Sequence, residues 1–333
     1  TRQISKCYPQ AARFAQQESE LFLASLYYHL HLKWRQGILD RYKDMFIYTN
    51  MDAPKFSFEF FPPRNEQQQR RFWTAFGSLQ TLNPDYISMT WGALGTTSQV
   101  SLDVLEALSI DTTVPVAAHL TCVGQNDQSV RQTIGKLSDL GITRFVALRG
   151  DAEKTHRQPD SLQHAIELVA ILAEDERRDI SVAAYPEVHP ESANADLDIY
   201  WLREKLNAGA QRAITQFFFE AETFLRFRDR ATKAGIHQTL VPGILPIHDI
   251  AKVLKFSSQC GASVPAKLVE RFSETSDAKA RRELAIEYSA RLCQALQREG
   301  VGEFHIYTLN QADLSYQLVK NLQGERSGVV AAA

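Results

Sequence analysis

The chain has 333 residues, of which 44% are hydrophobic and 23% charged, the balance of an ordinary soluble globular protein. Its 37 basic and 39 acidic residues give a formal net charge of −2, so net charge does not indicate nucleic acid or an anionic membrane as a partner. No apolar run approaches the roughly 18 residues needed to cross a bilayer, so we expect no membrane partner.

The first fifty residues differ from the rest. Leu23 to Trp34 places apolar side chains at the spacing of one helix face, namely Leu23, Leu26, Tyr27, Leu30 and Trp34. No basic segment or small-residue cleavage site frames this stretch as a signal peptide. We predict that residues 1–50 form an N-terminal extension, helical or partly disordered, that packs on the following domain or on a partner subunit. A non-native or poorly ordered leader is the alternative.

Eight short apolar runs follow, and most polar residues of chemical interest lie at the C-terminal end of one. The runs are 56–61, 86–90, 117–122, 145–151, 180–187, 213–219, 240–246 and 304–310. Strands with polar C-terminal ends are expected of a (β/α)8 TIM barrel, whose active site is built at the C-terminal mouths of its strands. Such a barrel takes about 250 residues, so we assign it to residues 51–325 and expect a frayed tail at 326–333.

Helical periodicity separates these runs. The predicted helices are Glu66–Leu82, Ser101–Leu108, Gln128–Leu140, Ser161–Ala173, Asp196–Ala208, Ala221–Ala234, Ile247–Phe256 and Ala278–Arg298. Regular alternation favours a closed parallel sheet. Gly261–Asp277 resembles an insertion, in which Val264-Pro265 could start a short helix. An open doubly wound sheet is the rival, but the first turn, Pro62-Pro63-Arg64, lacks its glycine fingerprint.

Glu59 is the most informative single residue. Phenylalanines flank it, and burial in an apolar run favours the protonated form of an unpaired carboxyl group, which suits a general acid near neutral pH. The structural alternative is a carboxylate paired with a nearby arginine, Arg64 or Arg149. The residues alone leave both interpretations open.

Other polar residues close later strands. Arg149-Gly150-Asp151 ends the fourth, where Gly150 allows close backbone approach and Asp151 adds a carboxylate. His119 and His189 follow strands too, although a lone histidine is more often structural. Gln216 is a neutral donor and acceptor that suits an amide or pterin-like ring. Thr308 and Asn310 end the last strand and could equally be caps.

The sequence does not indicate a metal site. It has no HExxH motif and no carboxylate–histidine spacing typical of metal ligands. The four cysteines, Cys7, Cys122, Cys260 and Cys293, are far apart and form no CxxC or Cys/His cluster. This pattern predicts a reduced, cytoplasmic protein without structural zinc.

Seven motifs, in order, carry a family resemblance. They are Phe58–Arg64 (FEFFPPR), His119–Cys122 (HLTC), Ala147–Asp151 (ALRGD), Val182–Glu191 (VAAYPEVHPE), Ile214–Phe219 (ITQFFF), Pro242–Pro246 (PGILP) and Tyr307–Asn310 (YTLN). Together they resemble the bacterial methylenetetrahydrofolate reductase family, from about Phe56 to Leu322. The likeness covers neither the first fifty residues nor the regulatory domain of eukaryotic relatives.

The resemblance implies a TIM-barrel flavoprotein with non-covalent FAD. It implies reduction of 5,10-methylenetetrahydrofolate to 5-methyltetrahydrofolate with NADH or NADPH, by ping-pong hydride transfer, in the methionine branch of one-carbon metabolism. Glu59 matches the general acid that protonates N10, and Asp151 matches the carboxylate near flavin and folate. Substrate contacts are carried over to Thr90, Gln216, Lys252, Phe256 and Gln311. A homo-oligomer is the expected assembly, with folate and nicotinamide as small-molecule partners.

The resemblance also assigns cofactor positions. For FAD they are Thr90, Trp91, His119, Arg149, Gly150, Asp151, Ala165, Tyr185, His189, Asp198 and Lys205. Trp91 replaces a usual tyrosine, and Lys252 and Gln311 stand where glutamine and arginine are expected. Trp201 and Glu204 replace an asparagine and an arginine that help to hold FAD, so we expect weaker FAD retention unless another base compensates.

Two other functions are consistent with a barrel of this kind. Proline dehydrogenase is a related flavin barrel, but we find no residues for its cationic substrate clamp. A catalytically silent barrel that binds a partner through its N-terminal helix is the second alternative. The presence of Glu59, Asp151 and Gln216 argues against it, because a silent copy need not keep all three.

Overall fold

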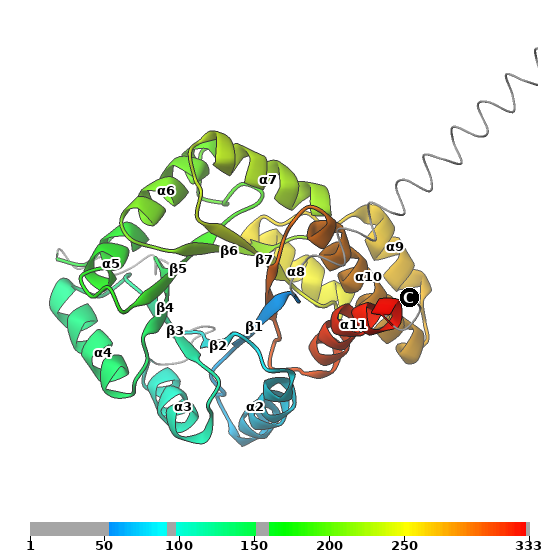
Figure 1. Ribbon diagram of the computed structural model, residues 1–333, viewed down its shortest axis with the longest axis horizontal. Helices are drawn as coiled ribbons and strands as arrows, with labels where there is room; N and C mark the ends of the chain where they lie inside the picture. Colours follow the sequence, from blue (N-terminus) through cyan, green and yellow to red (C-terminus); the bar gives the residue numbers. More distant parts are fainter. Residues whose placement is uncertain (1–52, 92–97, 151–159, 331–333) are drawn as a thin grey trace, which may run out of the picture. The chain divides into compact units, whose positions relative to one another are not determined.

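The computed structural model describes residues 53–91, 98–150 and 160–330, which belong to one compact unit that starts at Ala53. Eight parallel strands close into a barrel in the order β1 to β8, and helices surround it (Figure 1). The predicted (β/α)8 TIM barrel is therefore confirmed. Residues 1–50, for which we predicted an extension, lie outside the described residues. No helix of the described segments is long and apolar enough to cross a membrane.

Each predicted apolar run contains a strand. The strands are β1 (Lys55–Phe60), β2 (Tyr86–Met89), β3 (Val116–Thr121), β4 (Arg144–Leu148), β5 (Asp179–Ala184), β6 (Arg212–Phe217), β7 (Thr239–Ile244) and β8 (Glu303–Tyr307). Seven of the eight begin one residue before the predicted run. The added residue is often charged, as at Arg144, Asp179 and Arg212.

The helices follow the expected alternation. Their bounds are α2 (Glu66–Leu79), α3 (Ser98–Asp111), α4 (Asp127–Asp139), α5 (Ala165–Leu172), α6 (Ala195–Asn207), α7 (Ala221–Lys233), α8 (Ile250–Cys260), α9 (Ala266–Glu274), α10 (Ala278–Arg298) and α11 (Asp313–Val330), with a 3₁₀ turn η2 (Gln80–Leu82) after α2. Pro265 caps α9, the short helix suggested by Val264-Pro265. We did not predict α11.

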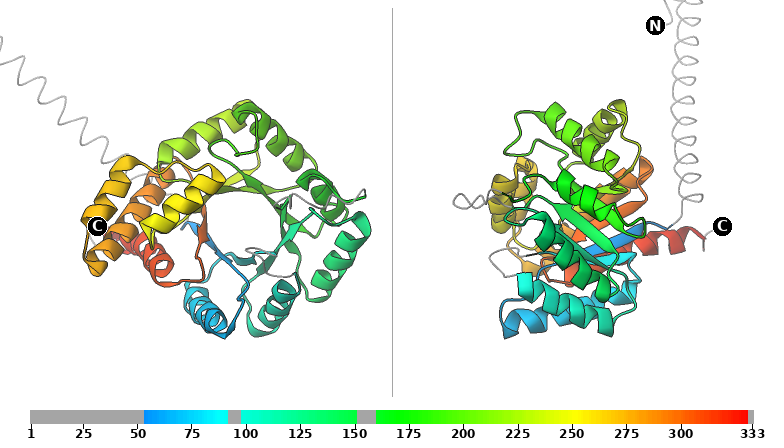
Figure 2. Two further views of the ribbon diagram at one scale, coloured as in Figure 1. Left: turned by 180° about the vertical axis from the view of Figure 1, so that it is seen from behind. Right: turned by 90° about the vertical axis from the view of Figure 1, so that its left-hand side faces the viewer.

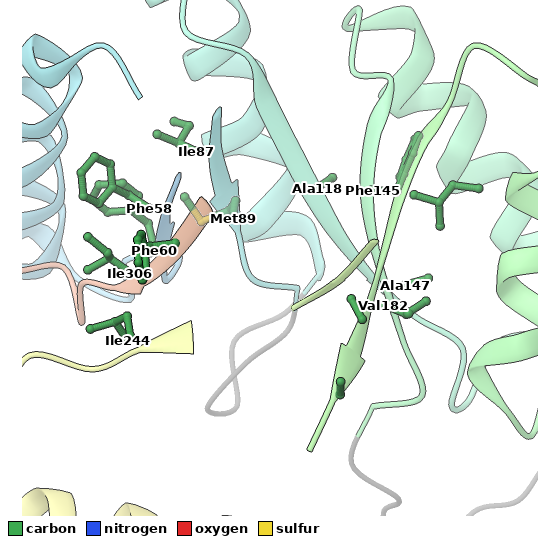
Figure 3. Close-up of a cluster of buried hydrophobic side chains, with 14 of the residues drawn as sticks. Phe58, Phe60, Ile87, Met89, Ala118, Phe145, Ala147, Val182, Ile244 and Ile306 are labelled. Atoms are coloured by element: carbon green, nitrogen blue, oxygen red, sulfur yellow. The ribbon is translucent and has the colours of Figure 1, made fainter. Parts of the chain in front are cut away.

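Alternate strand residues face the helices and form the main core. Phe58 and Phe60 are fully buried there with outward residues of the other strands, such as Ile306 (Figure 3). Phe60 meets Phe72 of α2 edge-on, with ring centroids 5.4 Å apart. Burial of one such aromatic side chain contributes about 1.5–3 kcal/mol. Helices cover the outside of the barrel in the end views of Figures 1 and 2 and in the side view of Figure 2.

The opposite face of each strand points into the barrel, and this interior is divided. One side is apolar, where Val146, Ile214 and Val241 pack together. At the N-terminal end, Arg144 and Arg212 converge on Asp179, with ion-pair distances of 3.5 and 2.5 Å. The rest of the interior, toward β1, β2, β3 and β8, is lined with polar side chains.

Candidate active site

Glu59 of β1 lies inside the barrel between two histidines. Its side chain is nearly buried, and its Oε2 atom is 3.5 Å from Nε2 of both His119 and His305. Because β2 separates β1 from β3, the contact with His119 crosses the interior. The flanking phenylalanines face the helices instead, so they do not form the surroundings of the carboxyl group.

The expected alternative partners of Glu59 are not found beside it. The Nη1 atom of Arg149 is 2.6 Å from Glu191, and the Arg64 side chain lies at the surface end of the β1–α2 loop. Of the two interpretations left open by the residues, the structure does not support the arginine pairing, because the ion-pair contacts of Glu59 among the described residues are with histidines. The cause is the period of a strand, which directs Glu59 inward while both arginines follow strand ends.

His305 is a functional candidate that we did not identify from the sequence. Its Nδ1 is 2.7 Å from the hydroxyl of Ser57, its register partner on β1. The tautomer that directs Nε2–H at Glu59 leaves Nδ1 to accept the Ser57 hydrogen. The ring of Tyr86 stacks on His305 with centroids 6.0 Å apart. Strand alternation from Tyr307 places His305 on the inward face, which is the signal that could have found it.

Side-chain hydrogen bonds from residues after β8 hold the end of β1 in place. Thr308 donates its hydroxyl to the carbonyl of Glu59 at 2.6 Å. The Asn310 side chain accepts from the Phe61 N–H and donates to the Phe61 carbonyl, both at 2.8 Å. These bonds fix the backbone that carries Glu59, so Thr308 and Asn310 act as strand caps.

His119 is electrically neutral at physiological pH. Burial lowers its pKa to about 4, against the opposing pull of the Glu59 carboxylate. A neutral ring beside Glu59 can donate or accept a hydrogen bond without adding a charge to the interior. His119 therefore carries no positive charge that would form an ion pair with Glu59.

Folding stability should depend on His119 between pH 6.5 and 4. The unfolded chain protonates this histidine near its ordinary pKa of 6.5, whereas the folded protein does so only near 4. Stability is thus fully present above pH 6.5 and falls as pH decreases toward 4, by about 3 kcal/mol. Chemical denaturation of the wild type and His119→Gln at several pH values measures it. We expect the difference in unfolding free energy between the wild type and His119→Gln to shrink as the pH falls from 6.5 to 4. If the two proteins lost stability in parallel over this range, the lowered pKa of His119 would be contradicted.

The end of β4 supplies a cation and a tight backbone position. Gly150 has a φ of +87°, and a Cβ there would lie 3.0 Å from the Cβ of Thr121. Glycine is therefore needed for the chain to pass this close to β3. Arg149 offers its guanidinium at the same turn, where Glu191 holds it. Asp151, the second predicted catalytic residue, lies outside the described residues.

A second group of predicted residues connects β5 to α6. Tyr185 meets His189 edge-on with centroids 4.5 Å apart, and the His189 N–H donates to Asp198 at 2.9 Å. Lys205 donates to the carbonyl of Ala183 at 2.6 Å, and burial lowers its pKa to about 8, although Asp198 opposes the shift. The structure thus brings four of the predicted FAD residues into one region.

Gln216 lies at an irregularity of the barrel. The β6–β7 register shifts between Ile214 and Phe217, and the Gln216 side chain accepts from the Phe217 N–H at 3.0 Å. The Tyr307 hydroxyl donates to the freed carbonyl of Thr215 at 2.7 Å. The Gln216 amide is therefore held at an irregular end of β6 by the adjacent backbone N–H.

The remaining predicted positions are spread over several elements. Thr90 and Trp91 are buried at the end of β2, and Ala165 begins α5. Phe256 packs in the cluster of buried side chains under α8 and α9, and Gln311 follows β8 half-buried. Lys252 is on the exposed side of α8, with its ammonium 3.9 Å from Asp249.

Two residues that depart from the family pattern have partners on the surface. The Trp201 ring stacks on His164 with centroids 5.7 Å apart. Glu204 is 3.4 Å from the Nε of Arg203, which offsets part of its negative charge. Arg203 is thus a base next to the position where a cation was expected. Among the described residues, no group of three or more His, Cys, Asp or Glu side chains could hold a metal ion.

Comparison with a solved structure supports the fold. A protein from Clostridium thermocellum, described as binding two copies of 5-methyl-5,6,7,8-tetrahydrofolic acid, superposes with a TM-score of 0.58. The match covers 84% of this chain and 98% of that one at 15% identity. At this identity the likeness concerns the fold alone.

Sequence comparison gives the family. The 5,10-methylenetetrahydrofolate reductase of Escherichia coli (strain K12) is 39% identical over 274 residues, or 82% of this chain and 92% of that protein. The Arabidopsis thaliana protein named methylenetetrahydrofolate reductase (NADH) 1 is 28% identical over 301 residues, or 86% of this chain and 50% of that protein. Residues 47–323 match the family described as methylenetetrahydrofolate reductase. With this match and the barrel that carries its motifs, the chain belongs to the methylenetetrahydrofolate reductase family.

Proposed function

We propose that the protein reduces 5,10-methylenetetrahydrofolate to 5-methyltetrahydrofolate with a nicotinamide as reductant and Glu59 as general acid. The observation that carries the proposal is the placement of a buried carboxyl group between two histidines inside the barrel. Support also comes from the names of the bacterial relatives, which cover most of the chain. The folate would meet Glu59 from the C-terminal mouth, where TIM-barrel active sites lie.

The residues at the mouth fit a flavin dinucleotide. Thr90 has a buried hydroxyl oxygen without a hydrogen-bond partner among the described residues, and Gly150 keeps the β4 turn free of a side chain. Arg149 and Lys205 would hold the pyrophosphate through their positive charges. A bound FAD would supply the hydride-transfer chemistry between the nicotinamide and the folate, and the two substrates would use the site in turn.

The protein side chains have separate roles in this proposal. Glu59 holds a proton on its carboxyl group and gives it to N10 of the folate as the methylene bridge opens. His305 and His119 lie on two sides of that carboxyl group, each with its Nε2 atom 3.5 Å from Oε2. Gln216 orients the folate ring or the nicotinamide through its amide. Roles for Lys252, Phe256, Gln311 and Asp151, the preference for NADH or NADPH, the cytoplasmic location and the homo-oligomer stay predictions.

An absorbance titration tests the proposal. Purified protein loaded with FAD should show a flavin band at about 450 nm, which NADH or NADPH bleaches and 5,10-methylenetetrahydrofolate then restores. A matched incubation with proline in place of the nicotinamide serves as the control, because proline should not bleach the band. Protein that takes up no FAD would instead support the silent, partner-binding barrel.

A further inference from the structure

The inward face of β2 carries a column of unsatisfied polar groups. Tyr86, Ser88 and Thr90 occupy alternate positions, are 5%, 1% and 6% exposed, and have no hydrogen-bond partner for their hydroxyl oxygens among the described residues. An orphaned buried polar group costs about 1–3 kcal/mol, so three in a row on one face need a reason. Their isolation is not a property of the whole interior, since Ser57 nearby bonds to His305.

The column leads to Glu59. Ser88 is the register partner of Glu59 across the β1–β2 ladder, and Tyr86 is the partner of Ser57 one step below. The Nε2 atoms of His119 and His305 also lack hydrogen-bond partners of normal geometry. Five unsatisfied polar atoms therefore surround or approach one carboxyl group.

The other end of the column reaches the charged floor of the barrel. The guanidinium carbon of Arg144 lies 5.2 Å from the centre of the Tyr86 ring, and its Nη1 is 3.3 Å from Asp85. The side chains of Arg144 and Asp85 are 27% and 36% exposed, so solvent reaches this ion pair at the end of the column. Burial raises the pKa of Tyr86, opposed by a hydrogen-bonding contact with the Ser57 hydroxyl that falls short of normal geometry, so the Tyr86 hydroxyl is neutral.

The spacing suits ordered water. Residues two apart on a strand are separated by about 6.6 Å, a gap that two waters in a row span with three hydrogen bonds of about 2.8 Å each. Buried water typically makes about three hydrogen bonds to polar groups that are otherwise unsatisfied. The hydroxyls of Tyr86 and Ser88 supply such groups in sequence along the strand.

We propose that water bound along Tyr86 and Ser88 carries protons from the N-terminal end of the barrel to Glu59. The inference rests on the proposed function, in which Glu59 loses one proton to N10 in every turnover. Glu59 is only 8% exposed, and a folate in the mouth would cover it further. A second route from the opposite end would then restore the acid while the mouth is occupied.

The step is a proton relay without redox change. A proton from solvent adds to the first water near Asp85, and each water or hydroxyl takes one proton as it releases another. The last O–H bond breaks on the water beside Ser88, and a new O–H bond forms on the Glu59 carboxylate. Tyr86 and Ser88 end as neutral hydroxyls, so the relay can repeat.

Ser88→Val and Ser88→Thr test the relay as a matched pair, because valine and threonine have the same shape and differ in the hydroxyl. With FAD-loaded enzyme, we expect steady-state turnover of Ser88→Val to be about tenfold below that of Ser88→Thr, part of the roughly 10²–10⁴-fold contribution of a general acid. A single turnover from prereduced enzyme should be equal in both, since under the proposed function it consumes one proton from Glu59 and needs no resupply. Small buffer acids such as imidazolium should restore the turnover of Ser88→Val.

Tyr86→Phe gives a second measurement. Its hydroxyl has no protein partner of normal hydrogen-bond geometry among the described residues, so thermal stability should change little, while steady-state turnover falls. Equal turnover of Ser88→Val and Ser88→Thr, or an equally slow single turnover of Ser88→Val relative to Ser88→Thr, would overturn the relay. If Glu59→Gln reduces folate normally, the proposed function itself fails, which is a different result from either of these.

Discussion

Glu59→Gln should abolish folate reduction and leave reduction of the flavin by NADH largely intact. Glutamine keeps the size and a hydrogen-bonding oxygen but has no proton to give to N10. A general acid contributes roughly 10²–10⁴-fold in rate, so reoxidation of the reduced enzyme by 5,10-methylenetetrahydrofolate should slow by at least that order. Stopped-flow absorbance measures the two half-reactions separately.

Glu59→Asp is the matched control for this change. Aspartate keeps an acidic proton but withdraws it by one methylene from the position between His119 and His305. We expect it to retain part of the folate half-reaction that Glu59→Gln loses. Equal loss of both half-reactions in Glu59→Gln would show that Glu59 has a structural role, and would contradict its assignment as the acid.

Gly243→Ala should be among the most destabilising single changes in the barrel. A Cβ at this position of β7 would lie 2.1 Å from the Thr215 carbonyl oxygen and 2.6 Å from the Tyr307 ring. The Gly243 N–H also donates to the Thr215 hydroxyl at 2.9 Å, so the backbone cannot move away without loss of that bond. Overpacking of a closed core costs about 1–3 kcal/mol and occasionally more, and we expect the upper end. Urea denaturation measures the loss.

Gly135→Ala offers the opposite result from the same chemical change. Gly135 lies inside α4, and a Cβ there would meet nothing within 4 Å. Alanine should stabilise this helix by about 0.5–1 kcal/mol. If Gly243→Ala were as harmless as Gly135→Ala, the bulge between Ile214 and Phe217 could not have the tight contact with Tyr307 described above.

The eight strands could be predicted because each contains an apolar run bounded by turns. Their first residues could not, since Arg144, Asp179 and Arg212 are charged and an apolar run excludes them. They belong to the strands because their side chains meet inside the barrel, where opposite charges neutralise each other. Local hydrophobicity does not contain that information, which depends on how distant strands are brought together.

The site was predictable in its residue types but only partly in its contacts. Glu59 was identified, yet its neighbours were expected to be arginines or phenylalanines, and they are histidines from β3 and β8. His305 looks like any single histidine in an apolar strand until the register with Ser57 is known. Helix α11 was missed because the last predicted helix, Ala278–Arg298, precedes β8. No helix was predicted after the last strand.

The pairing of β1 with β8 means that the site around Glu59 is complete only after the whole barrel has been synthesised and folded. Ser57 and His305 are 248 residues apart in sequence, and their bond forms only when the last strand docks beside the first. Such long-range pairing is late and slow relative to local structure. A nascent or shortened polypeptide with seven strands would therefore lack His305 beside Glu59. During refolding, the onset of turnover would report the docking of β8 on β1, which closes the barrel.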